Sequence, residues 1–166
     1  MLKPAAFFDR DGVINKDKDY VYKISEFEWI DGSKEAIKYL NEHNYHVFIV
    51  TNQSGIARGL YTEEEVNYLH KFINKELNKQ NAHIDEFFIS PYHPDNELEY
   101  RHLSHLRKPE IGMLEAAESK WRIKKNSSFM IGDKDIDIKC AKNFGIRGHL
   151  FKGGNLLDFI KSSENI

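Results

Sequence analysis

The chain has 166 residues, a length typical of one domain built around a single hydrophobic core. Its 24 Lys and Arg residues and 26 Asp and Glu residues give a formal net charge of -2, which excludes the strong basic excess of a nonspecific nucleic-acid or membrane-surface binder. The single cysteine, Cys140, excludes an internal disulfide and a zinc site built from several thiolates. We therefore expect one domain over residues 1–166 in a reducing compartment, the cytoplasm.

Five short apolar runs are typical of buried β-strands, because they end at polar residues or glycine and do not alternate with polar side chains. The runs are Ala5–Phe8, His46–Val50, Phe87–Ile89, Ser128–Ile131 and His149–Phe151. Such runs predict a sheet that is covered on both faces.

Between these runs, apolar residues recur at helical spacing, which predicts helices over 33–41, 62–77, 113–121 and 136–144. Thr62 and Glu65 have the spacing of a capping box, and Gly145 suits a left-handed helix end. Alternating strands and helices imply right-handed crossovers between parallel strands. The predicted fold class is α/β, a Rossmann-like three-layer sandwich with a mostly parallel central sheet.

Asp9, Thr51 and Asp133 each come at the end of a predicted strand. Ligands of open parallel sheets bind beyond the carboxyl ends of the strands, so we expect these residues to meet in one crevice. Asp9 and Asp11 lie two residues apart before Gly12. They are either a capped turn, or a metal-assisted pair in which one carboxylate attacks and the other transfers protons.

Two further segments carry groups that bind phosphate. Residues 51–55 offer a hydroxyl, two amides and the N–H groups of a glycine turn. Arg107 and Lys108 precede Pro109, a residue that suits a first helical turn. The guanidinium of Arg107 can bind a phosphate through two hydrogen bonds, and the ammonium of Lys108 adds a compact positive charge. Taken singly, the first segment is more typical of a polar loop and the second of two solvated basic residues.

A second acidic cluster follows Gly132 and comprises Asp133, Asp135 and Asp137. Three carboxylates in this spacing are typical of a hard-cation site. The alternative is that Asp133 or Asp135 caps a helix and Asp137 interacts with its dipole.

In this order, the segments 9–15 (DRDGVIN), 51–59 (TNQSGIARG), 107–109 (RKP) and 132–134 (GDK) resemble the haloacid dehalogenase superfamily of phosphatases. The resemblance runs from about Ala5 to Phe151. Within the superfamily, the chain is similar to the group of heptose-bisphosphate and histidinol-phosphate phosphatases. Residues 19–32 and 51–59 look more like the heptose-bisphosphate branch, because the histidinol-phosphate branch usually carries an acidic residue where Ser54 stands.

The resemblance implies a role for each matching residue. Asp9 would be the nucleophile that forms an aspartyl-phosphate, and Asp11 the general acid and base. Thr51 and Lys108 would hold the transferring phosphoryl oxygens. Mg²⁺ would be bound by the carboxylates of Asp9 and Asp133 and by the backbone carbonyl of Asp11. The residues near the substrate would be Asn15, Asn52, Gln53, Ser54, Arg107 and Lys134.

Members of this group often carry a zinc loop with three Cys and one His ligands. By the same resemblance, the ligand positions here are Ser90, Tyr92, Ser104 and Leu106, so we expect the structural zinc to be absent. Three histidines of this loop are either solvated or, with Asp95, bind another metal. They are His93, His102 and His105.

The spacing of the segments leaves no room for a cap domain, so we expect an open crevice with a rim formed by loops 15–27, 54–61 and 91–106. Five tyrosines are candidates for this rim: Tyr20, Tyr22, Tyr61, Tyr92 and Tyr100.

The sequence thus favours a Mg²⁺-dependent phosphomonoesterase for a small phosphorylated sugar, first of all the 7-phosphate of a heptose bisphosphate. Histidinol phosphate is the alternative substrate. A phospho-accepting receiver module is the alternative of another class, although its phosphorylated Asp would follow a later strand than its acidic pair. We expect neither nucleic acid nor a membrane as partner, and a monomer or weak homo-oligomer.

Overall fold

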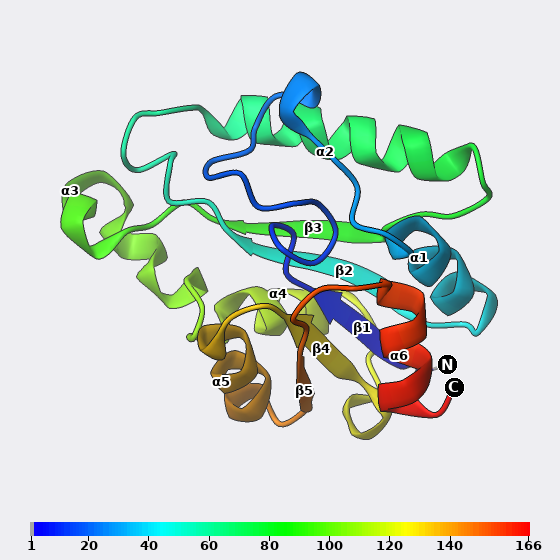
Figure 1. Ribbon diagram of the computed structural model, residues 1–166. Coiled ribbons are helices and arrows are strands. Elements are labelled where there is room, and N and C mark those ends of the chain that lie inside the picture. The colour runs from blue at the N-terminus through cyan, green and yellow to red at the C-terminus, as the bar shows by residue number, and fades with distance from the viewer. Residues whose placement is uncertain (1) are drawn as a thin grey trace.

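The computed structural model describes residues 2–166 and contains a five-stranded sheet in the order β3-β2-β1-β4-β5 (Figure 1). The strands are β1 (Ala5–Phe8), β2 (His46–Asn52), β3 (Glu86–Ser90), β4 (Phe129–Gly132) and β5 (Arg147–Leu150). Every pairing within the sheet is parallel. The predicted α/β class with a parallel central sheet is confirmed.

Helices cover both faces of this sheet, which is why its strands are apolar on both sides. Helices α1 (Ser33–Glu42), α2 (Glu63–Asn78) and α6 (Leu156–Glu164) share a core with Ala6 and Phe8 of β1. Helices α4 (Gly112–Lys120) and α5 (Asp135–Phe144) share a core with Ala5 and Phe7. Alternate residues of the central strand therefore face opposite helical layers. Figure 1 shows β1 between these layers.

Shorter helical segments lie in the connections. They are the 3₁₀ helices Ile24–Glu26, Pro94–Asn96, Arg101–Leu106 and Lys125–Ser127, and the short α3 (Glu97–Tyr100). Nothing the size of a cap domain interrupts the described residues. None of the helices within residues 2–166 is both long and apolar enough to cross a membrane.

Two predicted helix ends are confirmed. Thr62 caps α2 by accepting a hydrogen bond from the backbone N–H of Glu65 at 3.2 Å, while the Glu65 carboxylate accepts from the backbone N–H of Thr62 at 2.9 Å. Gly145 ends α5 with φ 88°, a left-handed conformation in which a side chain would be strained.

Several predicted bounds were wrong. Strand β2 continues to Asn52 because its end pairs with Ser90 of β3, so Thr51 lies within the strand and not after it. Pro109 is not in a first helical turn, because the backbone N–H of Glu110 donates to the carbonyl of Arg107 in a turn and α4 begins only at Gly112. Phe151 lies beyond β5.

Helix α6 was not predicted. Its buried residues are Leu156 and Ile160, an apolar stripe of only two positions, which is too short to signal a helix against two preceding glycines. The side chain of Asn155 caps the helix by accepting from the backbone N–H of Asp158 at 3.1 Å. This helix packs on α1 and completes the covered face.

Candidate active site

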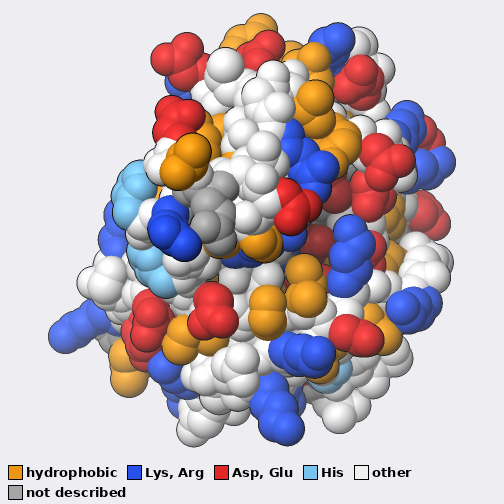
Figure 2. All heavy atoms as spheres, turned by 90° about the vertical axis from the view of Figure 1, so that its left-hand side faces the viewer, with side chains coloured by type: hydrophobic (Ala, Val, Ile, Leu, Met, Phe, Trp, Pro, Cys, Tyr) orange, Lys and Arg blue, Asp and Glu red, His pale blue; other side chains and the backbone are white. Residues whose placement is uncertain are grey.

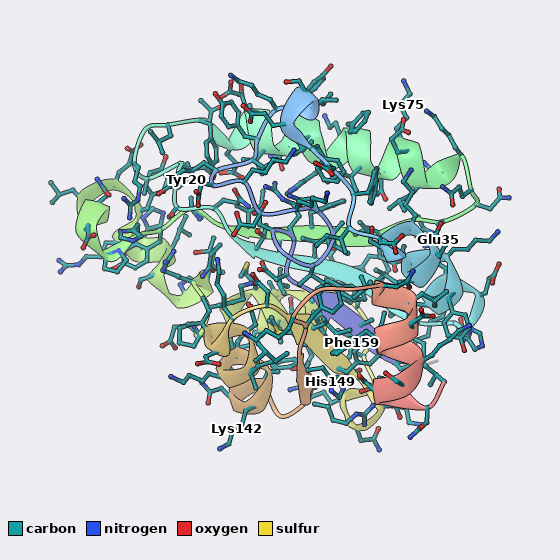
Figure 3. All side chains as sticks on the ribbon, viewed as in Figure 1. Tyr20, Glu35, Lys75, Lys142, His149 and Phe159 are labelled. Carbon is teal, nitrogen blue, oxygen red and sulfur yellow. The ribbon has the colours of Figure 1, made fainter. Side chains whose placement is uncertain are left out.

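The carboxyl ends of β1, β2 and β4 surround a cavity of about 220 Å³. Its lining residues are Asp9, Asp11, Asp17, Asp19, Tyr20, Asn52, Gln53, Ser54, Tyr61, Lys108, Lys134, Ile136 and Asp137. The face onto which these strands point carries interspersed acidic and basic side chains (Figure 2). Tyr20 lies at this end of the molecule (Figure 3). Of the three residues expected to meet here, Asp9 lines the cavity, whereas Thr51 and Asp133 are not among its lining residues.

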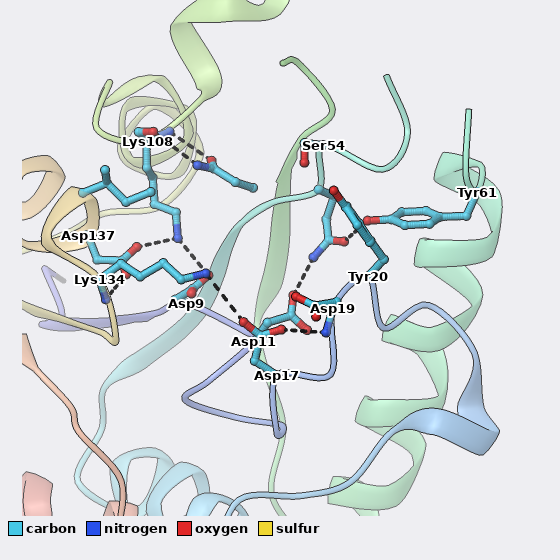
Figure 4. A pocket seen from close by; sticks show the side chains of 13 residues that line it. Asp9, Asp11, Asp17, Asp19, Tyr20, Ser54, Tyr61, Lys108, Lys134 and Asp137 are labelled. Atoms are coloured by element: carbon cyan, nitrogen blue, oxygen red, sulfur yellow. Dashed lines mark hydrogen bonds and ion pairs between the residues drawn. The ribbon is translucent and has the colours of Figure 1, made fainter. Parts of the chain in front are cut away.

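Lys108 is the buried cation of the cavity. Its ammonium lies 2.8 Å from Oδ1 of Asp9 and 2.7 Å from Oδ1 of Asp137 (Figure 4). Only 2 % of the Lys108 surface is exposed, and burial would by itself favour the neutral amine. The two carboxylates outweigh this effect and raise the pKa of Lys108 above its ordinary value, so the side chain is charged.

Carboxylate oxygens of Asp9, Asp133 and Asp137 all lie within 4.8 Å of one another. Burial raises the pKa of Asp9 to about 7 despite the nearby Lys108, and burial also raises the pKa of Asp133. Oδ1 of Asp133 is buried without a hydrogen-bond partner. The cluster therefore holds more negative charge than Lys108 compensates, and its oxygen donors fit a hard divalent cation such as Mg²⁺.

The Asp11 carboxylate is held by three side chains and does not belong to this cluster. Oδ1 accepts from Arg10 at 2.8 Å and from Nδ2 of Asn15 at 3.0 Å. Oδ2 accepts from Nε2 of Gln53 at 3.0 Å and from Arg10 at 3.1 Å. Asp11 therefore lines the cavity in a fixed orientation.

Gln53 connects the end of β2 to this carboxylate. Besides Asp11, its Nε2 donates to Oγ1 of Thr51 at 2.8 Å. Its Oε1 accepts from the Tyr61 hydroxyl at 2.6 Å (Figure 4). Tyr22 stacks on Tyr61 with ring centroids 4.8 Å apart. This wall of the cavity is thus ordered by side-chain hydrogen bonds and aromatic packing.

Asn52 holds the segment that carries Lys108. Its Oδ1 accepts from the backbone N–H of Lys108 at 3.0 Å, and its Nδ2 donates to the carbonyl of Lys108 at 3.2 Å. The predicted substrate residue Asn52 thus also fixes the lysine backbone.

Of the other predicted substrate residues, two line the cavity and two do not. Ser54 and Lys134 line the cavity, and the ammonium of Lys134 lies 3.6 Å from the Asp17 carboxylate. Asn15 is fully buried behind Asp11 and is not among the lining residues. Arg107 lies in a neighbouring cavity that also borders Lys108, and it donates to the carbonyl of Tyr92 at 3.1 Å.

Two lining carboxylates were not predicted, Asp17 and Asp19, and a third, Asp137, was a candidate only as part of the second acidic cluster. Asp137 lies in the first turn of α5, and Asp133 precedes that helix directly after β4. Its Oδ2 accepts from the backbone N–H of Lys134 at 3.1 Å, as a residue in the first turn would, while Oδ1 faces Lys108. Asp137 therefore contacts the start of the helix with one oxygen and Lys108 with the other. Asp135, in contrast, is exposed.

The four positions of the expected zinc loop lie apart from the acidic cluster. Ser90 is buried and its hydroxyl has no hydrogen-bond partner among the described residues, and Leu106 packs against the core beneath α4 and α5. Among the side chains that the structure describes, only the aspartates of the cavity form a group that could hold a metal ion, and none of the three loop histidines belongs to it.

The fold and this site define a phosphatase of the haloacid dehalogenase superfamily. Two solved structures support this class. A haloacid dehalogenase-like phosphatase from Mesorhizobium loti superimposes with a TM-score of 0.83 at 31% identity, over 92% of this chain and 74% of that chain. The D,D-heptose 1,7-bisphosphate phosphatase from B. bronchiseptica, complexed with magnesium and phosphate, superimposes with a TM-score of 0.80 at 28% identity, over 96% and 87%.

The model of the polynucleotide kinase 3 phosphatase family matches residues 4–147, and the chain belongs to this family. A D-glycero-beta-D-manno-heptose-1,7-bisphosphate 7-phosphatase from Rhodopseudomonas palustris is 42% identical over 160 residues, which cover 96% of this chain and 89% of the relative. A D-glycero-alpha-D-manno-heptose-1,7-bisphosphate 7-phosphatase from Photorhabdus laumondii is 38% identical over 152 residues, covering 90% and 83%.

Proposed function

We propose that the protein is a Mg²⁺-dependent phosphomonoesterase that removes the 7-phosphate of D-glycero-D-manno-heptose 1,7-bisphosphate. The observation that carries the proposal is the likeness to heptose-bisphosphate phosphatases over almost the whole chain, including one solved with magnesium and phosphate. The cavity supports it, because a carboxylate, a buried lysine and a cation-type acidic cluster lie together. Related enzymes for both anomers are known, so the preferred anomer is a question for experiment.

The cavity can bind a phosphate only if its negative charge is offset. Two unit charges of the same sign at about 4 Å repel by about 4 kcal/mol at an effective dielectric constant of 20. Asp9, Asp133 and Asp137 would hold Mg²⁺, which supplies positive charge for the phosphoryl oxygens. Lys108 and the Thr51 hydroxyl would hold the remaining oxygens of the transferring group.

The proposed reaction has two steps, carried by Asp9 and Asp11. A carboxylate oxygen of Asp9 attacks phosphorus while the bond from phosphorus to the sugar oxygen breaks, and Asp11 gives its proton to that oxygen. Asp11 then takes a proton from water, which attacks the aspartyl-phosphate and releases inorganic phosphate with Asp9 restored. General acid–base catalysis of this kind contributes roughly 10²–10⁴ in rate.

The second phosphate of the substrate would bind at Arg107. Arg107 is half-buried, and burial and the nearby Arg58 lower its pKa. Arg58 donates to Nε2 of His93 at 2.9 Å, and no carboxylate among the described side chains pairs with either arginine. Arg107 lines the cavity that also borders Lys108, and a guanidinium without an anionic partner among the described side chains matches a second phosphate.

A panel of phosphomonoesters assayed with Mg²⁺ tests the proposal: both anomers of the heptose bisphosphate, histidinol phosphate, and an oligonucleotide with a 3′-phosphate. We expect the heptose bisphosphate to give the highest kcat/KM. Preference for the oligonucleotide or for histidinol phosphate would contradict the substrate assignment.

Two controls address the mechanism. Asp9→Asn should abolish turnover, and EDTA should stop the enzyme until Mg²⁺ is restored. Metal analysis of the purified protein should find no stoichiometric zinc, and one zinc per chain would contradict the placement of the loop's ligand positions at Ser90, Tyr92, Ser104 and Leu106.

A further inference from the structure

Arg10 lies between the two candidate catalytic carboxylates in sequence, yet its side chain points away from the cavity into the core. It is the largest of the fully buried side chains, with 0 % exposure. Its Nη2 donates to both oxygens of Asp11 and to the carbonyl of Val21, and its Nη1 lies 3.2 Å from Nε2 of His70. The guanidinium is therefore the link between Asp11 and helix α2.

His70 is fixed by its surroundings. It lies on α2, is 3 % exposed, and stacks on Phe87 of β3 with ring centroids 4.3 Å apart and an interplanar angle of 17°. Burial, and then the charge of Arg10, lower the pKa of His70 well below its ordinary value, so the ring is neutral. A guanidinium only donates hydrogen bonds, so Nε2 must be the acceptor and the ring proton must be on Nδ1.

We propose that His70 is a positioning residue for the catalytic cycle, acting through Arg10 on the orientation of Asp11. The inference rests on the proposed roles of Asp9 and Asp11. Of the other two donors to Asp11, Gln53 lines the cavity and Asn15 is buried, and each reaches one oxygen, whereas Arg10 donates to both. Without an acceptor at Nε2, Nη1 of Arg10 has no partner, the guanidinium is held through Nη2 alone, and Asp11 loses part of its defined direction toward the reacting oxygen.

The formation and the hydrolysis of the aspartyl-phosphate, measured separately, distinguish a positioning role of His70 from a purely structural one. With 4-nitrophenyl phosphate, the leaving phenolate needs little help from an acid, so formation of the aspartyl-phosphate, measured as a burst of 4-nitrophenolate, depends little on Asp11. Hydrolysis of the aspartyl-phosphate depends on Asp11 as base and sets the steady-state rate when Asp11 is displaced. A misdirected Asp11 therefore slows the steady state and spares the burst.

The test compares His70→Leu, which removes the acceptor, with His70→Gln, which places a carbonyl oxygen at a similar reach. We expect His70→Leu to lower the steady-state rate by about tenfold with an unchanged burst rate, and His70→Gln to restore most of it. In an Asp11→Asn background, His70→Leu should cause no further loss. His83→Leu, at an exposed histidine, is the matched control and should change neither phase.

Equal loss in both phases, no loss in either, or no rescue by glutamine would overturn the proposal. If a His70 variant does not fold, a measurement on the unaltered protein still tests the proposal. The ¹⁵N chemical shifts must show His70 neutral with the proton on Nδ1, and a proton on Nε2 would contradict the hydrogen bond. Because 4-nitrophenyl phosphate is a general phosphatase probe, a wrong heptose assignment leaves this test intact.

Discussion

The Lys108 ammonium lies 2.7 Å from Oδ1 of Asp137, a carboxylate that is itself 1 % exposed. A buried charge pair that loses one partner leaves the other uncompensated. Asp137 is also within 4.8 Å of the carboxylate oxygens of Asp9 and Asp133, so it contributes to both the cation cluster and the lysine.

Asp137→Asn should therefore weaken Mg²⁺ binding and lower activity at limiting Mg²⁺ by roughly 10–100-fold, the usual effect of losing a supporting residue of a metal site. The measurement is a Mg²⁺ titration of phosphatase activity. The matched control is Asp135→Asn, which removes an exposed carboxylate from the same helix end and should leave the titration unchanged. A normal Mg²⁺ requirement in Asp137→Asn would remove this residue from the site.

Gly12 is packed against the acidic cluster. Its φ is 89°, and a Cβ at this position would lie 2.3 Å from Oδ2 of Asp133, so Gly12→Ala combines backbone strain with displacement of a candidate ligand. We expect a loss of about 1–2 kcal/mol in the free energy of unfolding and a clear loss of Mg²⁺ affinity.

Gly145 separates these two effects, because its φ is 88° and a Cβ there meets nothing within 4 Å. Gly145→Ala should cost a similar free energy in chemical denaturation with no change in Mg²⁺ affinity. If both variants bound Mg²⁺ equally well, Asp133 would not be a ligand.

Local patterns were enough to predict the sheet and the meeting of its strand ends. Uninterrupted apolar runs such as Ala5–Phe8 must be covered on both faces, and a parallel sheet brings Asp9 and Asp133 to one edge. The capping box at Thr62 was equally predictable, since it needs only residues three positions apart.

The contacts that depend on tertiary packing were not predictable. Nothing near Arg10 in sequence indicates that its side chain turns inward to His70, sixty residues away. The end of β2 at Asn52 is set by the pairing of Asn52 with Ser90. The position of Arg107 outside the main cavity depends on the course of the loop after β3. Such features follow from side chains that meet only in the folded chain.

The buried neutral His70 should make the protein less stable in mild acid. Its pKa is lowered in the folded chain, so the unfolded chain binds the proton first, and stability is complete above about pH 6.5 and falls as the pH decreases below it. The slope from this one group approaches about 1.4 kcal/mol per pH unit.

His70→Gln removes this titration. Between pH 7.5 and 5.5, we expect the wild-type protein to lose about 1 kcal/mol more than the variant in urea denaturation, because every other group titrates alike in the two proteins. Parallel losses in both would mean that His70 is protonated in the folded state.

Arg107 should discriminate a bisphosphate from a monophosphate. Arg107→Gln removes one of the two guanidinium groups that lack an anionic partner among the described side chains, so we expect KM for the heptose bisphosphate to rise about tenfold with little change in kcat. Hydrolysis of 4-nitrophenyl phosphate, which has no second phosphate, should stay near the wild-type rate. Arg122→Gln is the control, because Arg122 is an exposed arginine outside the lining of either cavity. An equal loss on both substrates would place Arg107 in the chemistry of phosphoryl transfer and not in recognition of the second phosphate.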